Sequence, residues 1–360
     1  MKFFGFFIHP AGVSMPRPAA PRPPTPAPYG LFIGLIACNA LAWLWALLAF
    51  HDYPLLLGSA VLAYSFGLRH ALDADHIAAI DNATRKLLQE GQRTTHVGLY
   101  FSLGHSSVVI IASALIALSA RRLQGALEAF HGIGALIGTS VSAAFLLLVA
   151  LINLVILRSV YQAFRRVRRG ERIGEAELHG LLAGSGPLAR LARPLFGLIR
   201  RGWHLYPLGL LFGLGFDTAT EIGLLGIAAS QAAQQLPMLS ILVFPALFTA
   251  GMALVDSADS VLMTGAYRWA QVRPARKLYY NLTITSASVL VALLVGGLEA
   301  LNLLAGQLGL EGGLWDVVAR LNEQFGLIGY LIVALFVSTW ALAWVVYRYK
   351  GYDRLDPTPA

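Results

Sequence analysis

Hydrophobic residues gather in eight long runs along the chain, and polar residues are concentrated between them. A helix rises about 1.5 Å per residue, so roughly 20 apolar residues cross the ~30 Å hydrocarbon layer of a bilayer. The runs lie at residues 30–50, 55–80, 96–119, 133–157, 206–230, 238–263, 280–304 and 325–347. The pattern predicts an all-α integral membrane protein, a bundle of eight transmembrane helices embedded in the lipid bilayer.

The composition agrees with this prediction and excludes several classes of protein. Hydrophobic residues make up 57% of the 360 residues and charged residues only 13%, against about 25% charged residues in soluble domains. Cys38 is the only cysteine, which excludes an internal disulfide and a multi-cysteine metal cluster. The sequence contains no phosphate-binding loop motif, so neither ATP hydrolysis nor an ATPase subunit is implied.

Positive charge predicts the orientation, because Lys and Arg accumulate in cytoplasmic loops. With the N-terminus inside, the inner segments hold 23 Lys and Arg residues and the outer loops hold 3. The net charge of +8 therefore suits a membrane face better than a nucleic-acid groove. We expect both termini in the cytoplasm.

The predicted parts are a Pro-rich tail at 1–29, helices one to four within 30–157, a basic cytoplasmic loop at 158–205, helices five to eight within 206–347 and a tail at 348–360. The arginines of the basic loop either face solvent and lipid or bind a regulatory partner.

The second run ends in a dense polar cluster of Arg69, His70, Asp73, Asp75 and His76. Each charge at the centre of a bilayer helix costs roughly 2.5–3.5 kcal/mol, and a bound cation would offset that cost. His70, Asp73 and His76 follow i,i+3 spacing and share one broad face of a regular helix. Asp75 points elsewhere, which predicts either a pair with Arg69 or a local break in the helix.

Three further runs carry polar groups that a lipid-facing helix would not tolerate. They are His105 and Ser106 in the third run, Asp217, Thr218 and Glu221 in the fifth, and Asp256 and Asp259 in the sixth. With the N-terminus inside, all these groups lie between the membrane midplane and the cytoplasmic side, where transporters commonly bind their substrates. Asn39 in the first run is expected to form an interhelical hydrogen bond, and a role in selectivity stays open.

The types of side chain indicate a metal. Imidazole with carboxylate suits borderline divalent ions such as Ni²⁺, Co²⁺ or Zn²⁺, and the absence of thiolates disfavours Cu⁺. Several histidines also disfavour an all-oxygen Mg²⁺ or Ca²⁺ site. The carboxylates of the fifth and sixth runs would complete the coordination, orient it from outside or carry protons. Alternatively, these groups only hold helices together through hydrogen bonds, and Arg69 neutralises Asp73 or Asp75.

These motifs resemble the nickel/cobalt transporter family of prokaryotic and fungal permeases. The family hallmark, Arg-His-Ala followed by Val or Phe and Asp-Ala-Asp-His-Ile, is matched by residues 69–77. Three more family motifs are matched in order at 103–109, 214–221 and 251–259. The resemblance implies high-affinity uptake of Ni²⁺ or Co²⁺ by a multi-pass protein of a prokaryotic cytoplasmic membrane, with no prosthetic group. It also implies that His70, Asp73, Asp75 and His76 bind the metal.

Leu72 departs from the family pattern at a position linked to nickel-versus-cobalt preference. The chain also lacks the long histidine-rich loop of the related exporters, which favours uptake over export of the same ions. An intramembrane metalloenzyme is disfavoured because no HExxH or HxxHH box is present, and an aspartyl protease because its Gly-x-Gly-Asp motif is absent. We therefore expect a transporter and not an enzyme.

Overall fold

A computed structural model describes residues 28–119, 124–169, 199–215, 219–234, 236–270 and 274–349. The described residues form helices and short connections, with no β-strand among them. The predicted Pro-rich tail, most of the basic loop and the C-terminal tail lie outside this part of the chain.

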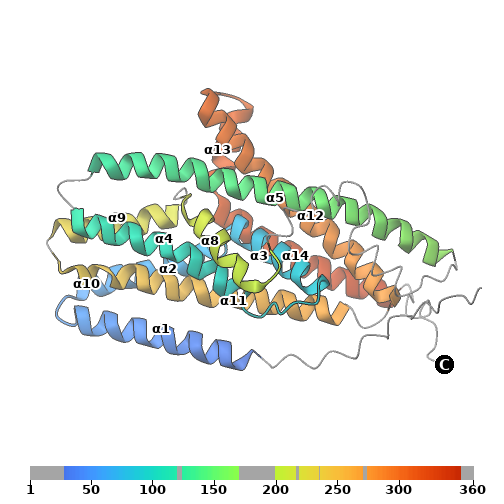
Figure 1. Ribbon diagram of the computed structural model, residues 1–360, viewed down its shortest axis with the longest axis horizontal. Helices are drawn as coiled ribbons and strands as arrows, with labels where there is room; N and C mark the ends of the chain where they lie inside the picture. Colours follow the sequence, from blue (N-terminus) through green and yellow to red (C-terminus); the bar gives the residue numbers. More distant parts are fainter. Residues whose placement is uncertain are drawn as a thin grey trace, which may run out of the picture.

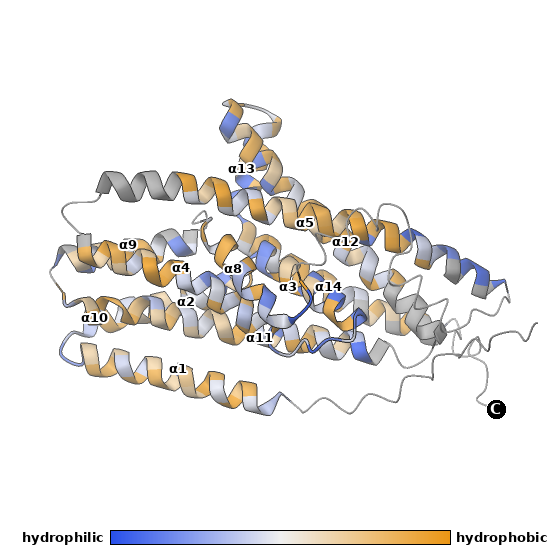
Figure 2. Ribbon diagram, in the orientation of Figure 1, coloured by the Kyte–Doolittle hydropathy of each residue, from blue (hydrophilic) through white to orange (hydrophobic). Residues whose placement is uncertain are grey.

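Among the described residues, six helical segments are long and apolar enough to cross a membrane, and they lie roughly along one direction (Figure 1). Each coincides with one of the predicted runs, because only a helix satisfies every backbone polar group within its own segment in lipid. Most of their residues are hydrophobic (Figure 2). The helices are α1 (Tyr29–Phe50), α4 (Val97–Ser119), α5 (Gln124–Arg168), α10 with α11 (Met238–Ile241 and Val243–Ala270), α12 (Pro274–Leu308) and α14 (Phe325–Tyr349).

The second predicted run is two helices and not one. α2 (Pro54–His70) and α3 (Ala74–Gln89) are bent by 50° at a three-residue break. The break confirms the irregularity that the orientation of Asp75 suggested. It also corrects the prediction that His70, Asp73 and His76 share a face of one regular helix.

α3 continues beyond the predicted end of this run. Arg85 and Lys86, which the charge count placed in an inner loop, lie on α3 and are only 3% and 8% exposed. Fourteen of the sixteen residues of α3 are buried, whereas α1 buries four of its twenty-two. α3 contacts α4, α5, α11, α12 and α14, so it is enclosed by other helices of the bundle.

The fifth predicted run is also divided. A 3₁₀ turn, η1 (Gly202–His204), leads into α8 (Leu205–Gly213), and α9 (Ala219–Ala233) follows. Residues 216–218, which lie between α8 and α9, are outside the described residues. A short helix, α13 (Leu314–Glu323), lies between α12 and α14. Both interrupted runs, the second and the fifth, carry predicted site residues at or beside the interruption.

Candidate metal centre

The break after α2 turns two site residues toward each other. His70 is the last residue of α2, and Asp73 lies at the N-cap of α3 with an extended backbone (ψ 150°). Asp73 forms no side-chain cap on α3. Its Oδ2 instead lies 3.0 Å from Nδ1 of His70. The residue type that would ordinarily cap a helix is used here to orient an imidazole.

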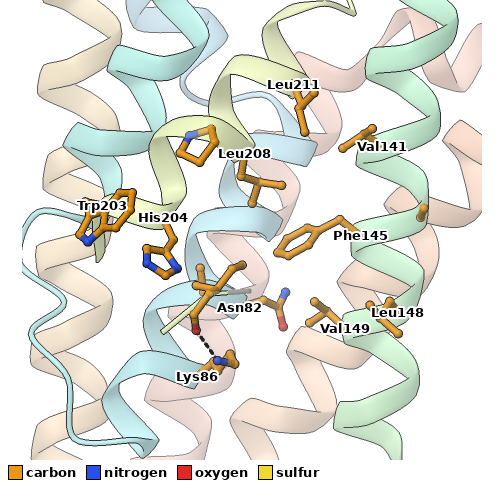
Figure 3. Close-up of a pocket in the computed structure, with 14 residues that line it drawn as sticks. Asn82, Lys86, Val141, Phe145, Leu148, Val149, Trp203, His204, Leu208 and Leu211 are labelled. Atoms are coloured by element: carbon orange, nitrogen blue, oxygen red, sulfur yellow. Dashed lines mark hydrogen bonds between the residues drawn. The ribbon is translucent and has the colours of Figure 1, made fainter. Parts of the chain in front are cut away.

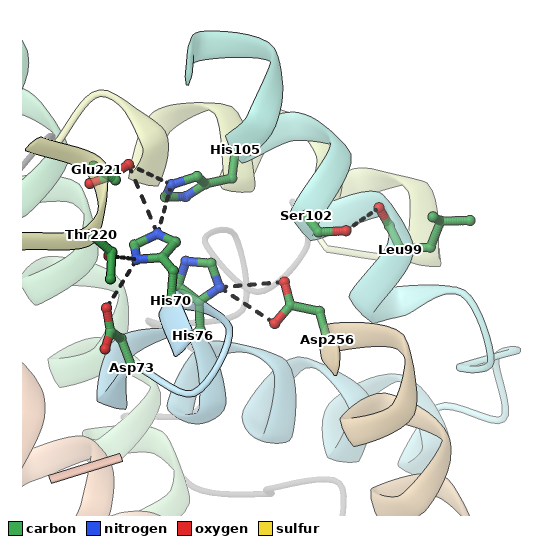
Figure 4. Close-up of polar contacts among 9 residues, drawn as sticks. All are labelled: His70, Asp73, His76, Leu99, Ser102, His105, Thr220, Glu221 and Asp256. Carbon is green, nitrogen blue, oxygen red and sulfur yellow. Dashed lines mark hydrogen bonds and ion pairs between the residues drawn. The ribbon is translucent and has the colours of Figure 1, made fainter. Parts of the chain in front are cut away.

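Three imidazoles from α2, α3 and α4 face one another in the interior (Figure 4). His70, His76 and His105 are 1%, 0% and 2% exposed. Their ring centroids are separated by 4.5 Å (His70–His76), 4.7 Å (His70–His105) and 4.8 Å (His76–His105). One nitrogen from each ring lies within 4.8 Å of the other two. We call these three residues the histidine cluster.

Two carboxylates orient the rings of the cluster from outside. Asp73 accepts a hydrogen bond from Nδ1 of His70, and Asp256 on α11 lies 3.4 Å from Nδ1 of His76. A carboxylate without its proton only accepts, so Nδ1 of each ring carries the hydrogen in these contacts. In the neutral imidazole Nε2 then keeps its lone pair. Carboxylates commonly fix the tautomer of metal-binding histidines in this way.

α9 completes the cluster from the opposite side. Oε1 of Glu221 lies 2.8 Å from Nε2 of His105 and 3.9 Å from Nε2 of His70. The two Nε2 atoms themselves are 3.0 Å apart. Thr220 places its hydroxyl 3.2 Å from Nδ1 of His70. The histidine cluster and the polar side chains that contact it therefore come from five helices, α2, α3, α4, α9 and α11.

Two buried nitrogens of the histidine cluster have no hydrogen-bond partner, Nε2 of His76 and Nδ1 of His105. The hydroxyl of Ser106, the residue after His105, is also buried without a partner. A buried polar atom without a partner costs about 1–3 kcal/mol. Such groups in a native structure call for an explanation, and a ligand is one. Imidazole nitrogens beside carboxylate oxygens are donors that suit a borderline divalent ion.

The remaining predicted residues that the structure describes are not members of the histidine cluster. Asp75 is in the first turn of α3 and is not part of the histidine cluster. Asn39 donates to the carbonyl of Ala250 at 3.2 Å, which ties α1 to α11 as expected of an interhelical hydrogen bond. Asp259 has a buried Oδ2 without a partner. Asp217 and Thr218 lie outside the described residues.

Arg69 and Leu72 lie close to α14. Arg69 is exposed and forms no ion pair within 4 Å among the residues that the structure describes, so the pair with Asp73 or Asp75 is not seen here. A Cβ added to Gly326 would lie 3.1 Å from the Arg69 guanidinium and from the Asp73 carboxylate. Leu72 is half-buried in the break, where its carbonyl meets Gly329. Both residues are therefore fixed by the contact between the break and α14.

Two glycines of α8 set the position of His105. A Cβ added at Gly209 would lie 2.0 Å from the carbonyl oxygen of Phe101, and one at Gly213 would lie 2.7 Å from that of His105. Phe101 and His105 are one helical turn apart on α4, as the two glycines are on α8. The absence of side chains lets the two helices pack backbone against backbone, which holds His105 at the depth of the cluster.

Sequence reasoning missed a second buried polar group, which we call the Asp81 network. Tyr267 and Ser288 donate to the two oxygens of Asp81 at 2.5 and 2.7 Å. Asn82, the next residue of α3, accepts hydrogen bonds at Oδ1 from Arg85 on α3 at 3.0 Å and from Asn153 on α5 at 2.9 Å. The i,i+4 spacing of Asp81 and Arg85 was the available signal, but both lie past the predicted end of the second run.

A helical bundle that buries imidazoles and carboxylates together beside a broken helix has the architecture of a membrane transport protein for a metal ion. Residues 56–346 match the family model described as high-affinity nickel-transport protein. The chain belongs to this high-affinity nickel-transport protein family.

Its relatives carry nickel and cobalt names. The chain is 57% identical over 343 residues to a high-affinity nickel transport protein of Cupriavidus necator, covering 95% of this chain and 97% of the relative. It is 39% identical to a high-affinity nickel-transport protein of Helicobacter pylori, covering 90% and 98%. It is 43% identical to a cobalt transport protein of Rhodococcus rhodochrous, covering 79% and 81%. No solved structure matches the chain significantly.

Proposed function

We propose that the protein takes up Ni²⁺ or Co²⁺ and that the histidine cluster is the site through which the ion passes. The observation that carries this proposal is the meeting of three buried imidazoles whose nitrogens include two without a partner. Nickel and cobalt are the ions named for the relatives, and imidazole is a ligand that both accept.

Each residue has a distinct role in this proposal. His70, His76 and His105 bind the ion, with Glu221 beside His70 and His105. Asp73 and Asp256 hold two of the rings from outside and balance the charge of the ion. When Nε2 of His105 binds the metal, the hydrogen that it shares with Glu221 would move to Nδ1 of the same ring, which has no partner, because a metal-binding nitrogen must offer its lone pair. Asp75 joins the coordination when residues 71–73 rearrange.

The break between α2 and α3 is the element that we expect to move. Broken helices at a substrate site are common in transporters, where unwound backbone lines the cavity. A divalent ion moving inward gains about 4.6 kcal/mol per 100 mV, from about 2.3 for each charge. The membrane potential alone would therefore drive uptake without a coupled proton.

The topology that we propose has eight spans with both termini in the cytoplasm, in the cytoplasmic membrane of a prokaryote. Six spans are single apolar segments, α2 with α3 forms a seventh, and α8 with α9 forms the eighth. The bias of 23 inner to 3 outer Lys and Arg supports this orientation, and it is 21 to 3 when the buried Arg85 and Lys86 are left out. The segments 1–29, 158–205 and 348–360 would then all face the cytoplasm.

Radiometal uptake in cells that express the chain tests the proposal. We expect accumulation of nickel or cobalt, with nickel, cobalt and zinc in competition to rank the substrates. His70→Ala should abolish accumulation while the protein stays in the membrane. His51→Ala is the matched control, because His51 is exposed and paired only with its neighbour Asp52. Full uptake by His70→Ala would remove the cluster from the mechanism, and increased nickel tolerance without uptake would indicate an exporter.

A further inference from the structure

A cavity of about 530 Å³ lies between α3, α5 and α8 (Figure 3). None of the three residues of the histidine cluster is among its lining residues. Its volume is within the range of about 300–1,000 Å³ that is typical of sites for small molecules. α5 forms one wall, which includes Phe145 and Leu148, and α8 forms the other, which includes Leu208 and Leu211. These walls are apolar along most of their length.

Most of the polar groups of the cavity lie toward one end, and Asn82 on α3 lies between them and the apolar end (Figure 3). Lys86, Trp203 and His204 lie at the polar end, whereas Val141 and Leu211 lie at the opposite end (Figure 3). Trp203 is 53% exposed, so this end opens at the surface of the bundle. Tryptophan is enriched where a membrane protein meets the headgroup layer. The cavity is therefore amphipathic in the same sense as a phospholipid, with one polar end and one long apolar part.

Lys86 holds the backbone of Ile199 at the polar end of the cavity, and its own charge is already paired with Glu90. Its ammonium donates to the carbonyl of Ile199, which also lines the cavity, and forms an ion pair with Glu90 at 3.0 Å. Arg200 and Arg201 follow directly. Both are exposed, and neither forms an ion pair with a carboxylate within the described part of the chain. Two arginines without a carboxylate partner in the described residues thus lie in the chain between Ile199 and Trp203, which both line the apolar cavity.

We propose that this cavity binds one acyl chain of an anionic phospholipid, with the lipid phosphate held by Arg200 and Arg201 beside Trp203. The chain of the lipid lies along Phe145 and Leu208. Charge selects the lipid, because basic pockets between membrane helices attract anionic headgroups, and guanidinium binds phosphate oxygens through two parallel hydrogen bonds. The bound lipid would connect η1 and α8 to α3 and α5. α8 also carries the glycines that position His105.

Native mass spectrometry of the full chain tests this proposal. The protein is purified from vesicles made of equal parts phosphatidylglycerol and phosphatidylcholine, and the retained lipid is identified by its mass. We expect one phosphatidylglycerol per protein in preference to phosphatidylcholine. The double variant Arg200→Gln/Arg201→Gln should bind it about 30-fold more weakly, which corresponds to about 1 kcal/mol for each arginine.

Two further variants separate the headgroup from the cavity. Ala144→Phe fills the cavity from α5 without a change of charge, so it should reduce the retention of phosphatidylglycerol while the chain remains folded. Arg165→Gln/Arg169→Gln removes the same charge from the exposed end of α5 and should leave retention unchanged. Equal retention of both lipids, or an equal loss in the Arg165/Arg169 variant, would overturn the proposal. So would the absence of any retained lipid, which is expected if the residues preceding Ile199 fill the cavity.

Discussion

α3 carries two buried polar groups about 7.5 Å apart along its axis, the histidine cluster at His76 and the Asp81 network five residues later. In the Asp81 network both carboxylate oxygens accept hydrogen bonds, from Tyr267 and Ser288. One buried side-chain atom of this network, Nη1 of Arg85, has no partner. In the histidine cluster, one nitrogen of each of two rings has no partner, Nε2 of His76 and Nδ1 of His105. Both groups are buried, but they differ in how many of their polar atoms have hydrogen-bond partners. This difference distinguishes a group that holds helices together from one that can bind a ligand.

The two groups also differ in what connects them. The Asp81 network joins α3 to α11 and α12 through two hydroxyl donors, which are not ligands for a soft or borderline metal. The histidine cluster joins α3 to α2 and α4 through rings whose mutual contacts are ones that a metal would replace. We therefore expect substitutions in the two groups to have opposite signatures in transport and in stability.

The largest effect is expected for His105→Ala. Removal of this imidazole takes away one of three proposed ligands and leaves Oε1 of Glu221 without its closest contact. We expect nickel uptake per folded molecule to fall to the level of cells without the protein. His96→Ala, on an exposed histidine, serves as the control and should keep full uptake. Retention of half the uptake or more would show that two imidazoles suffice.

Asp81→Asn should show the reverse signature. An amide has one acceptor oxygen, so one of the hydroxyls of Tyr267 and Ser288 loses its acceptor, at a cost of about 1–3 kcal/mol of unfolding free energy. We expect a clearly lower melting temperature and nearly normal uptake per folded molecule. Asp52→Asn, at the exposed end of α1, should change neither quantity. Loss of uptake at an unchanged melting temperature would assign Asp81 to transport and remove the distinction between the two groups.

Gly209→Ala tests how the helix packing maintains the histidine cluster. The added methyl group would lie 2.0 Å from the carbonyl oxygen of Phe101, so α8 and α4 must separate. Overpacking typically costs about 1–3 kcal/mol. We expect the nickel concentration for half-maximal uptake to rise by roughly tenfold, the equivalent of 1.4 kcal/mol. Gly226→Ala is the matched control, because nothing lies within 4 Å of the added methyl group. Equal behaviour of the two variants would contradict a role for this contact.

The comparison shows which parts of the molecule the sequence could predict. Six of the eight predicted runs are single apolar helical segments, because length and hydropathy suffice to identify a helix that is uniform along its length. The approach of His70, His76 and His105 also followed, since buried imidazoles must avoid lipid. The division of the second run was only suggested by the direction of Asp75, and its 50° bend lies where the carbonyl of Leu72 meets Gly329 of α14, a contact between distant parts of the sequence.

Charged residues at the end of a run were the main source of error. Arg85 and Lys86 look like loop residues, because sequence patterns do not reveal the partners that permit their burial. Those partners are Asn82 one turn away and the carbonyl of Ile199, which is 113 residues distant. The contacts between Glu221 and His105 and between Thr220 and His70 were equally hidden, because the crossing of α9 with α2 and α4 is a tertiary feature.

The smallest effect is expected at Leu72, which belongs to neither polar group but lies in the break between His70 and Asp73. Its backbone is fixed by the contact of its carbonyl with Gly329, so a change of side chain reshapes the space beside the ligands without removing any of them. Nickel and cobalt differ mainly in the geometry that they prefer. We expect Leu72→Val and Leu72→Phe to change the ratio of nickel to cobalt uptake by a few-fold at equal expression. Leu118→Val, at a position 69% exposed near the end of α4, is the control. An unchanged ratio in both Leu72 variants would mean that the shape of the break does not select the ion, and selectivity would then have to come from the carboxylates around the histidine cluster.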